Sequence, residues 1–279
     1  PDSLALNRLL RQMSDAGCDY CFAEVSSHAL EQKRTAGLRF EGAVFTNITH
    51  DHLDYHKNFK NYIYAKKKLF DNLDKNAFAL VNADDKNADI MLQNCSANIY
   101  RYALKSLVDY NTRVIENTFE GLKLEIDNRE VWSLLAGDFN AYNLSAVYAT
   151  ARYLGARAQD ILQQLSALPP VPGRMESFVI GGITGIVDYA HTPDALKNIL
   201  QTITPVKTSG QKLITVVGTG GNRDKDKRPI MARIAFDNSD KLVLTSDNPR
   251  YERPELITDD MLAGLSKEEQ NRVLNITDR

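Results

Sequence analysis

The sequence has few of the features that mark secreted, membrane or nucleic-acid-binding proteins. It holds three cysteines and one tryptophan in 279 residues, and three cysteines are too few for the disulfide framework of a small secreted domain. No apolar run approaches the ~20 residues that a membrane-spanning helix needs. The 34 basic and 36 acidic side chains give a net charge of −2, which provides no bulk attraction to nucleic acid or anionic lipid. We therefore expect a globular protein that binds neither nucleic acid nor membrane.

The cysteines provide only weak evidence for a redox or zinc site. Cys18 and Cys21 have the C-x-x-C spacing that occurs in redox and zinc sites. However, no second pair follows, and Cys21 lies in the apolar run 20–25, which is typical of a buried strand. We therefore expect buried structural thiols in a reducing, cytoplasmic compartment.

Short apolar runs alternate with helical periods along the first half of the chain. Strands are predicted at 20–25, 43–46 and 78–81, and helices from Leu4 to near Gly17, from Ser27, and over 62–73. This alternation predicts an α/β fold with a mostly parallel sheet and helices on both faces. A β-rich stretch is predicted at 112–135, with Gly121 and Asn128 as turn residues, and a long helix at 140–154.

Three prolines within 169–172 mark the clearest interruption of this pattern. Such a segment continues neither a helix nor a central strand. Beyond it, strands are predicted at 185–188, 212–217 and 241–245, and helices at 193–203 and 229–236. We therefore predict two domains, 1–170 and 171–279, of which the second is a further α/β unit.

Histidines and acids concentrate after two of the predicted strands. Four of the five histidines lie between His28 and His56, and Glu24 ends the strand that precedes them. Because ligands collect at the carboxyl ends of strands in open α/β sheets, Glu24 and the loop at 50–56 could hold a divalent metal. The spacing alone leaves ordinary loop capping equally open. Three lysines, 66–68, follow on the next helix, where solvated side chains are the ordinary expectation and at least one should face inward.

Several motifs in order resemble the central domain of the Mur ligase family. They are 24–28 (EVSSH), Gln32 and Arg34, 45–56 (FTNITHDHLDYH) and 65–66 (AK). The narrower resemblance is to the members that add meso-diaminopimelate, and it covers essentially the whole chain. It implies an ATP-dependent amide ligase of peptidoglycan precursor synthesis, with a central Mur ligase domain followed by a Rossmann-like α/β domain.

By this resemblance, Glu24 and His52 bind Mg²⁺, and Lys66 carries a CO₂-derived carbamate that faces the metal. Carbamylation turns a cationic amine into a carboxylate-like group, the kind of oxygen ligand that magnesium prefers. The reacting amine has to be neutral, so a desolvated Lys66 is expected. The resemblance assigns the substrate UDP-MurNAc-L-Ala-D-Glu to Ser26, Gln32 and Arg34.

Three further strings resemble the nucleotide-binding motifs of the family. They are 137–144 (GDFNAYNL), 173–176 (GRME) and 188–196 (DYAHTPDAL). Without the resemblance, 137–144 is a helix start, and Thr192 with Pro193 is a capped one. With it, the ATP site is expected to comprise Asn140, Asn143, Arg174, Asp188 and His191.

A glycine-rich loop and an arginine motif follow two strands of the second predicted domain. The segment 218–229 (GTGGNRDKDKRP) matches neither a Walker A motif nor a dinucleotide fingerprint, but its glycines allow close backbone approach to a ligand. The string 247–250 (DNPR) resembles the motif of members that add meso-diaminopimelate. It implies that Arg223 and Arg250 clamp a carboxylate, while Asp247 and Asn248 hold the zwitterionic end. The next residues, 251–254 (YERP), depart from the usual SEDP.

The implied reaction forms an acyl phosphate from ATP on the D-glutamate γ-carboxylate, which the amine of meso-diaminopimelate then attacks. A related ligase that adds L-lysine, or an inactive nucleotide-sugar-binding fragment, would share most of these motifs. The family pattern also leads us to expect an N-terminal domain and a phosphate loop before Pro1, and further C-terminal residues after Arg279. We therefore expect this chain to be monomeric and inactive alone.

Overall fold

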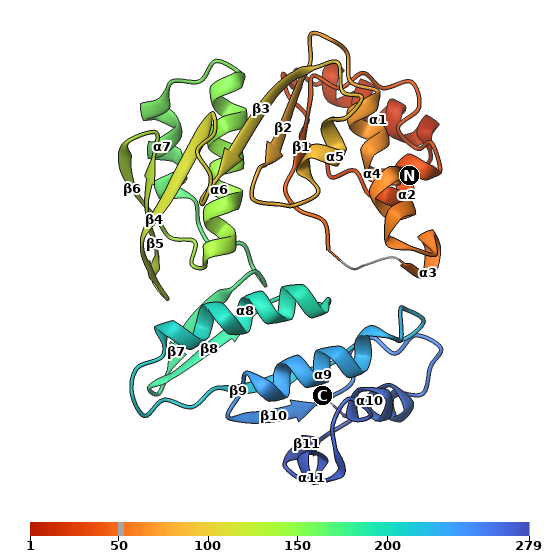
Figure 1. Cartoon of the computed structure of the whole chain (residues 1–279), viewed down its shortest axis with the longest axis vertical. Coiled ribbons are helices and arrows are strands. Elements are labelled where there is room, and N and C mark those ends of the chain that lie inside the picture. The colour runs from red at the N-terminus through yellow and green to blue at the C-terminus, as the bar shows by residue number, and fades with distance from the viewer. Residues whose placement is uncertain (50–52, 279) are drawn as a thin grey trace. The chain divides into compact units, whose positions relative to one another are not determined.

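The computed structural model describes residues 1–49 and 53–278, with only the backbone of Leu53 and Asp54 (Figure 1). The chain divides into two compact units. Unit 1 comprises Pro1–Ile48, Tyr55–Thr112 and Tyr142–Ala156, and unit 2 contains Arg113–Ala141 and the chain from Arg157 onward. Since residues 113–141 cluster with the later part of the chain, the units differ from the predicted domains 1–170 and 171–279, and that boundary stays a prediction.

Unit 1 is built on parallel strands, as the alternation of apolar runs predicts. Its strands and helices are β1 (Gly42–Phe45), β2 (Phe78–Asn82), β3 (Asn98–Ala103), the start of β4 (Tyr110–Thr118), α1 (Ser3–Asp15), α2 (Ser27–Glu31), α3 (Leu53–His56), α4 (Phe59–Asp71), α5 (Ala88–Leu92) and most of α6 (Asp138–Tyr153). The strands β1, β2, β3 and β4 pair in that order, each parallel to the next. The side chain of Asp2 caps α1 and that of Asn58 caps α4, by accepting backbone N–H groups at the helix starts.

Helices cover both faces of this sheet. Phe78 and Leu80 of β2 pack against Ala146 and Ala149 of α6 on one face. Phe45 is paired in register with Val81, so it points to the opposite face. There the ring of Phe45 meets Phe70 of α4 edge to face, with centroids 6.5 Å apart. The prediction of a parallel sheet with helices on both faces is therefore confirmed for this unit.

The strand predicted at 20–25 is wrong. Residues 20–26 form neither helix nor strand, and the side chains of Tyr20 and Phe22 are 59% and 75% exposed. Cys18 and Cys21 are exposed free thiols, so the expectation of buried cysteines is also wrong for this pair. An apolar run becomes a buried strand only where a neighbouring strand pairs with it, and in the described part of the chain none pairs with this one.

Unit 2 begins with a hairpin and continues into an α/β layer. Its elements are the end of β4, β5 (Gly121–Ile126), β6 (Arg129–Ser133), α7 (Ala158–Ala167), β7 (Glu176–Ile180), β8 (Ile183–Val187), α8 (Pro193–Val206), β9 (Ile214–Val217), α9 (Lys227–Asp237), β10 (Lys241–Leu244), α10 (Pro254–Leu262), α11 (Lys267–Gln270) and β11 (Val273–Asn275). Asp127 and Asn128 link the antiparallel strands β5 and β6 with φ angles of 52° and 58°, as a two-residue hairpin turn requires. The predicted turn at Asn128 is thus confirmed.

The α/β layer is a three-stranded parallel sheet in the order β11-β10-β9. One face packs against α8, α9 and α10 through a shared apolar core. That core comprises Leu196, Leu200, Val217, Met231, Ala232, Ala235, Leu242, Leu244, Met261 and Leu265. The other face carries exposed apolar side chains, including Ile214 at 58% and Val216 at 63%. Among the described helices of both units, none is long and apolar enough to cross a membrane.

Candidate functional site

The residues predicted to bind the UDP-linked dipeptide gather around α2. Ser26 caps this helix, its Oγ accepting the backbone N–H of Ala29 at 3.2 Å. Arg34 donates from Nε and one terminal nitrogen to Oε1 of Gln32, at 3.0 and 2.6 Å. The amide nitrogen of Gln32 in turn lies 3.4 Å from the hydroxyl of Tyr55. The structure thus brings Gln32 and Arg34 together, and it gives Ser26 a capping role besides its predicted one.

A buried histidine beside α2 was not singled out from the sequence. Nε2 of His56 lies 2.9 Å from the hydroxyl of Ser27, and the His56 side chain is buried. The ring of His28 lies 4.1 Å from that of Tyr55 and 5.4 Å from that of His56, measured between centroids. The concentration of histidines in the sequence pointed to this place, but only the fold shows which of them pair.

The three lysines of α4 have three different environments. Lys67 is buried and forms an ion pair with Asp71 one turn later, so the expectation that one lysine faces inward is confirmed. Lys68 is exposed and pairs with Glu31. Lys66 is half-buried, with its Nζ 5.4 Å from the centroid of the Tyr62 ring. The carbamylation of Lys66 stays a prediction.

The predicted magnesium ligands are not all described. Glu24 is exposed in the segment without helix or strand, and His52 lies outside the described residues. Among the residues that the structure describes, no group of three histidine, cysteine, aspartate or glutamate side chains is placed to hold a metal ion. The ligand set of Glu24, His52 and Lys66 therefore stays a prediction.

Asn140 and Asn143 lie one turn apart in the first half of α6. The side chain of Asn140 donates to the backbone carbonyl of Ala136 at 2.7 Å. Asn143 is exposed. Gly137, just before the helix, has a φ of 94°, which favours glycine at this turn. The role of these asparagines toward adenine stays a prediction.

The other predicted nucleotide residues gather around one tyrosine. The guanidinium of Arg174 lies 4.9 Å from the centroid of the Tyr189 ring, and the ring of His191 lies 5.3 Å from it. Both oxygens of Asp188 accept backbone N–H groups, from Met175 at 2.8 Å and from Ala190 at 2.7 Å. Asp188 thus joins the strand end to the turn that carries Arg174. Tyr189 was missed from the sequence, although it stands within the motif 188–196.

His191 also has a defined tautomer when it is neutral. Its Nδ1 lies 3.1 Å from the backbone carbonyl oxygen of Tyr189. Because a carbonyl oxygen only accepts, Nδ1 carries the hydrogen and Nε2 is left as the ring's acceptor. The side chain is exposed at the start of α8, where Thr192 caps the helix and Pro193 is its first residue, as predicted.

A cleft in unit 2 brings together part of the predicted ATP site and part of the predicted amino-acid site. Of the described residues predicted for these two sites, those that do not line it are Arg174, Asn140, Asn143 and Asn248. It has a volume of about 340 Å³ and lies at the carboxyl ends of β9 and β10. Its charged and imidazole side chains are Asp188, His191, Arg223, Asp224, Lys227, Asp247 and Arg250. The hydroxyls of Thr219 and Thr245, which also line it, are buried and have no hydrogen-bond partner among the described residues. Buried polar groups without partners at a cleft are expected to be satisfied by ligand or water.

Two loops form much of this cleft, and they are bound to each other. We call 218–226 the glycine loop and 245–253 the arginine loop. The backbone N–H of Gly221 donates to the carbonyl of Asn248 at 2.9 Å, and a terminal nitrogen of Arg250 donates to the carbonyl of Gly221 at 2.7 Å. Arg250 has a φ of 51°, a conformation that non-glycine residues adopt only when their surroundings hold them there. The loops therefore place Arg250 in the wall of the cleft.

Two glycines of the glycine loop allow its backbone to lie close to the backbone of the arginine loop. A Cβ on Gly221 would lie 1.9 Å from the carbonyl oxygen of Pro249, and one on Gly218 would lie 2.6 Å from that of Thr245. The sequence predicted close backbone approach to a ligand. The close approach observed at these two positions is to the backbone of the arginine loop.

Gly221→Ala is therefore expected to destabilise the chain more than Gly220→Ala. The new methyl group at 221 meets backbone, whereas at 220 it meets the end of the flexible Arg250 side chain at 2.8 Å. Inserting a methyl group into a tightly packed place costs about 1–3 kcal/mol. Thermal unfolding followed by circular dichroism measures the difference. Equal melting temperatures for the two variants would contradict this account of the contact.

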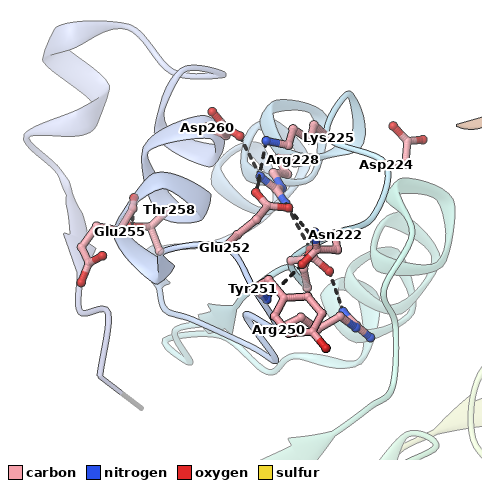
Figure 2. Close-up of polar contacts among 12 residues, drawn as sticks. Asn222, Asp224, Lys225, Arg228, Arg250, Tyr251, Glu252, Glu255, Thr258 and Asp260 are labelled. Carbon is pink, nitrogen blue, oxygen red and sulfur yellow. Dashed lines mark hydrogen bonds and ion pairs between the residues drawn. The ribbon is translucent and has the colours of Figure 1, made fainter.

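Behind the loops lies a buried ion-pair network, shown in Figure 2. Arg228, in the first turn of α9, has a side chain that is 0% exposed. Its two terminal nitrogens donate to the two carboxylate oxygens of Glu252, each at 3.0 Å. The same guanidinium reaches Asp260 of α10 at 2.8 Å and the carbonyl of Gly220 at 3.3 Å. Glu252 belongs to the segment YERP, which differs from the usual SEDP of the family at its first and third positions. The glutamate is the same in both.

The pKa of Glu252 is lowered to about 2, chiefly by its hydrogen bonds from Arg228 and then by the backbone N–H of Asn222. A lowered pKa in the folded state stabilises the fold above the unfolded value near 4.5, and this contribution is lost as the pH falls from about 4.5 toward 2. The stability difference between the wild type and Glu252→Gln should therefore shrink over this range. Denaturant unfolding at pH 6 and pH 3 measures it. A difference that stays the same at both pH values would contradict the assignment.

Comparison with known proteins places these features in a family. Residues 1–151 match the Mur ligase middle domain, and residues 173–279 match the glutamate ligase domain of Mur ligases. The chain belongs to the Mur ligase family. Its α/β architecture, with a mostly parallel sheet followed by a second α/β layer, agrees with that assignment.

Individual Mur ligases resemble the chain over its whole length. The UDP-N-acetylmuramoyl-L-alanyl-D-glutamate--2,6-diaminopimelate ligases of Bacteroides thetaiotaomicron and Cytophaga hutchinsonii are 54% and 53% identical to it over 280 residues. The alignments cover 100% of this chain but 58% and 57% of those ligases. A solved structure of a ligase of the same name covers 100% of this chain and 58% of its own, with a TM-score of 0.67 and 35% identity. The chain thus spans little more than half the length of these relatives.

Proposed function

We propose that the full-length protein containing this chain is an ATP-dependent amide ligase of the MurE type, which adds meso-diaminopimelate to UDP-MurNAc-L-Ala-D-Glu. The cleft of unit 2 carries this proposal, because it is lined both by residues assigned to ATP and by residues assigned to the amino acid. The names of the relatives, which are 2,6-diaminopimelate ligases acting on UDP-N-acetylmuramoyl-L-alanyl-D-glutamate, support the choice of substrates. In the proposed reaction, ATP phosphorylates the D-glutamate γ-carboxylate, and the amine of the amino acid displaces phosphate from the acyl phosphate.

The charges of the cleft suit an amino acid with a second zwitterionic end. Meso-diaminopimelate carries a carboxylate and an ammonium group at each end. Arg223 and Arg250 provide forked donors for a carboxylate, and Asp247 provides an acceptor for an ammonium group. Asn248, which follows Asp247 but is not among the described residues that line the cleft, is proposed to assist through its side-chain oxygen, which also accepts the backbone N–H of Arg250 at 3.3 Å. Both hydrogen bonds that the guanidinium of Arg250 makes to described residues use one terminal nitrogen, so its other edge is available for a ligand. L-Lysine has no distal carboxylate to meet these arginines.

The nucleotide is proposed to bind near Tyr189. Arg174 and His191 flank this ring, and Asp188 holds the backbone beneath it. A positive guanidinium is suited to phosphate oxygens, and charge stabilisation accounts for much of the catalysis of phosphoryl transfer. Asn140 and Asn143 are proposed to contact adenine.

A magnesium ion is proposed to be held by Glu24, His52 and a carbamate on Lys66. Carboxylate and carbamate oxygens are the donors this hard cation prefers, and the partial burial of Lys66 supports the proposed modification. The ion would supply positive charge where phosphoryl transfer develops negative charge. Ser26, Gln32 and Arg34 are proposed to bind the UDP-linked dipeptide. The hydrogen bonds that join Arg34 to Gln32 and Gln32 to Tyr55 support the assignment for Gln32 and Arg34.

We further propose that the protein works as a monomer in the cytoplasm, where nucleotide-linked precursors and ATP are available. The division into a central domain, 1–170, and an amino-acid-binding domain, 171–279, is part of the same proposal. The matches to the two family domains, at 1–151 and 173–279, fall on either side of that boundary.

Phosphate release by the full-length protein tests the proposal. The assay contains UDP-MurNAc-L-Ala-D-Glu, ATP and Mg²⁺, with either meso-diaminopimelate or L-lysine as the acceptor. Phosphate release that depends on meso-diaminopimelate, with the tripeptide product seen by mass spectrometry, is the expected result. Release that depends on L-lysine would favour the related ligase. Binding of the UDP-linked dipeptide without any turnover would favour a non-catalytic role.

A further inference from the structure

We propose that Arg228 and Glu252 position the glycine loop and the arginine loop, and thereby set the affinity of the cleft for its amino-acid substrate. This inference rests on the proposed function, because it concerns the cleft that would bind meso-diaminopimelate. Among the described residues that line the cleft are Arg223, on the glycine loop, and Arg250, on the arginine loop. Arg228 and Glu252 are not among them, so we assign them a positioning role rather than a catalytic one.

The Arg228 side chain joins three parts of unit 2 that are distant in sequence. It extends from the start of α9 to Glu252 of the arginine loop, to Asp260 of α10 and to the carbonyl of Gly220 in the glycine loop. The guanidinium is fully buried and the Glu252 side chain is 15% exposed, so their ion pair is largely shielded from water, whereas Asp260 is 45% exposed. Loss of one partner of a buried ion pair leaves an incompletely compensated charge, which is unfavourable. The network therefore strongly favours one arrangement of the two loops.

Glu252, the partner of Arg228, also contacts two residues of the glycine loop. Its carboxylate accepts the backbone N–H of Asn222 and lies 3.2 Å from Nζ of Lys225. The side-chain oxygen of Asn222 accepts the backbone N–H of Tyr251 at 3.0 Å. Figure 2 shows these contacts between the two loops, with Arg250 beside Asn222. Asn222 is therefore bonded directly to Glu252, and Tyr251 is connected to the pair through Asn222.

The backbone conformation of the two loops supports the view that contacts between them fix their relative position. Asn222 and Arg250 have φ angles of 50° and 51°. Asparagine adopts this region readily, whereas arginine does so when surrounding contacts impose it, and for Arg250 the main contact is its hydrogen bond to the carbonyl of Gly221. Arg223 directly follows Asn222, and Arg250 directly precedes Tyr251. A change in the buried pair is therefore transmitted to both predicted carboxylate-binding arginines over one or two residues.

The test uses Glu252→Gln and Arg228→Lys in the full-length protein. Glutamine keeps the shape of Glu252 but removes its charge, and lysine keeps the charge of Arg228 but removes its fork. Because the displaced arginines would lose well-aligned hydrogen bonds to a charged group of the substrate, we expect the KM for meso-diaminopimelate to rise by about 10- to 100-fold. The KM for ATP and the kcat at saturating amino acid should change little. Glu252→Asp, which keeps the charge, should recover part of the affinity.

A second ion pair in unit 2, in which an arginine also donates to both oxygens of a glutamate, provides the control. Arg233 donates to both oxygens of Glu269, at 2.9 and 2.6 Å, and neither residue lines the cleft among the described residues. Glu269→Gln removes an ion pair with the same two-bond geometry but with more exposed side chains, 36% and 26%, and is expected to leave the KM for meso-diaminopimelate unchanged. Circular dichroism melting of both glutamine variants separates loss of stability from loss of loop position.

If Glu252→Gln fails to fold, Asn222→Gly provides a second test of the contact between the two loops. Glycine adopts the φ of 50° at this exposed position without strain, and the change removes only the side-chain contact to Tyr251. A raised KM for meso-diaminopimelate with an unchanged melting temperature supports the positioning role. An unchanged KM in every folded variant, or an equal loss in kcat and in both KM values, overturns it. If the wild type shows no phosphate release dependent on meso-diaminopimelate, the proposed function fails instead, which is a distinct result.

Discussion

If the proposed ligase activity holds, replacing Lys66 with alanine is expected to lower the turnover of the full-length protein by on the order of 10²–10³-fold, the range seen when one group that stabilises developing charge is removed. Lys66 lies half-buried on α4, beside the ring of Tyr62. If its amine carries a carbamate, the alanine variant loses a negatively charged oxygen donor together with the side chain that supports it. Phosphate release in the presence of all three substrates measures the loss.

Short carboxylic acids such as acetate or propionate should restore part of this activity, because they supply the missing carboxylate in the space that the side chain leaves. The matched control is Lys68→Ala, two residues later on the same helix, where the lysine is exposed and pairs with Glu31. That variant should retain turnover and should not respond to acetate. A Lys66→Ala enzyme that works at the wild-type rate would remove Lys66 from the site.

Replacing Arg250 with alanine is expected to raise the KM for meso-diaminopimelate by about 10- to 100-fold, since a hydrogen bond to a charged group contributes about 1.5–3 kcal/mol. The arginine lines the cleft and is held by the carbonyl of Gly221 at 2.7 Å. Its fork is suited to the distal carboxylate, which L-lysine lacks. The variant should therefore lose discrimination between the two amino acids, measured as the ratio of their kcat/KM values.

Two further variants test whether the effect depends on the guanidinium fork and on the position of Arg250. Arg250→Lys keeps the charge without the fork, so it should recover little of the discrimination. Arg253→Ala removes an exposed arginine of the same loop that lies 3.7 Å from Glu255, and it should leave the KM unchanged. If Arg250→Ala preferred meso-diaminopimelate as strongly as the wild type does, the specificity would have to come from another part of the cleft.

Much of the fold was predictable from the sequence, because local patterns determine many of its elements. The run 78–81 became β2, and the helical period at 62–73 became α4. The run 20–25 has a similar apolar character, yet its side chains are exposed. An apolar run predicts burial, but which strand pairs with it depends on the tertiary structure. β3 was missed because only its last residues are well buried, against β2 and α6.

The candidate site was predictable where it follows strand ends and not where it depends on side-chain pairing. Arg223 and Asp247 follow two neighbouring parallel strands, so their convergence on one cleft follows from topology. The pairing of Arg228 with Glu252, 24 residues apart, has no motif in the sequence. His56 and Ser27 are likewise 29 residues apart and meet only in the fold. Asp188, predicted as a ligand-binding residue, also holds two backbone N–H groups, which its motif does not reveal.

The apolar face of the β9–β11 sheet affects how the unfolding of this chain should be followed. Ile214, Val216 and Leu274 are more than half exposed on that face while the chain is folded. Hydrophobic dyes such as anilinonaphthalene sulfonate should bind there, so their fluorescence would be high before any heating and would not indicate a molten state. The single tryptophan, Trp132 in β6, would report on one hairpin. Far-ultraviolet circular dichroism, which follows the helices of both units, avoids both problems.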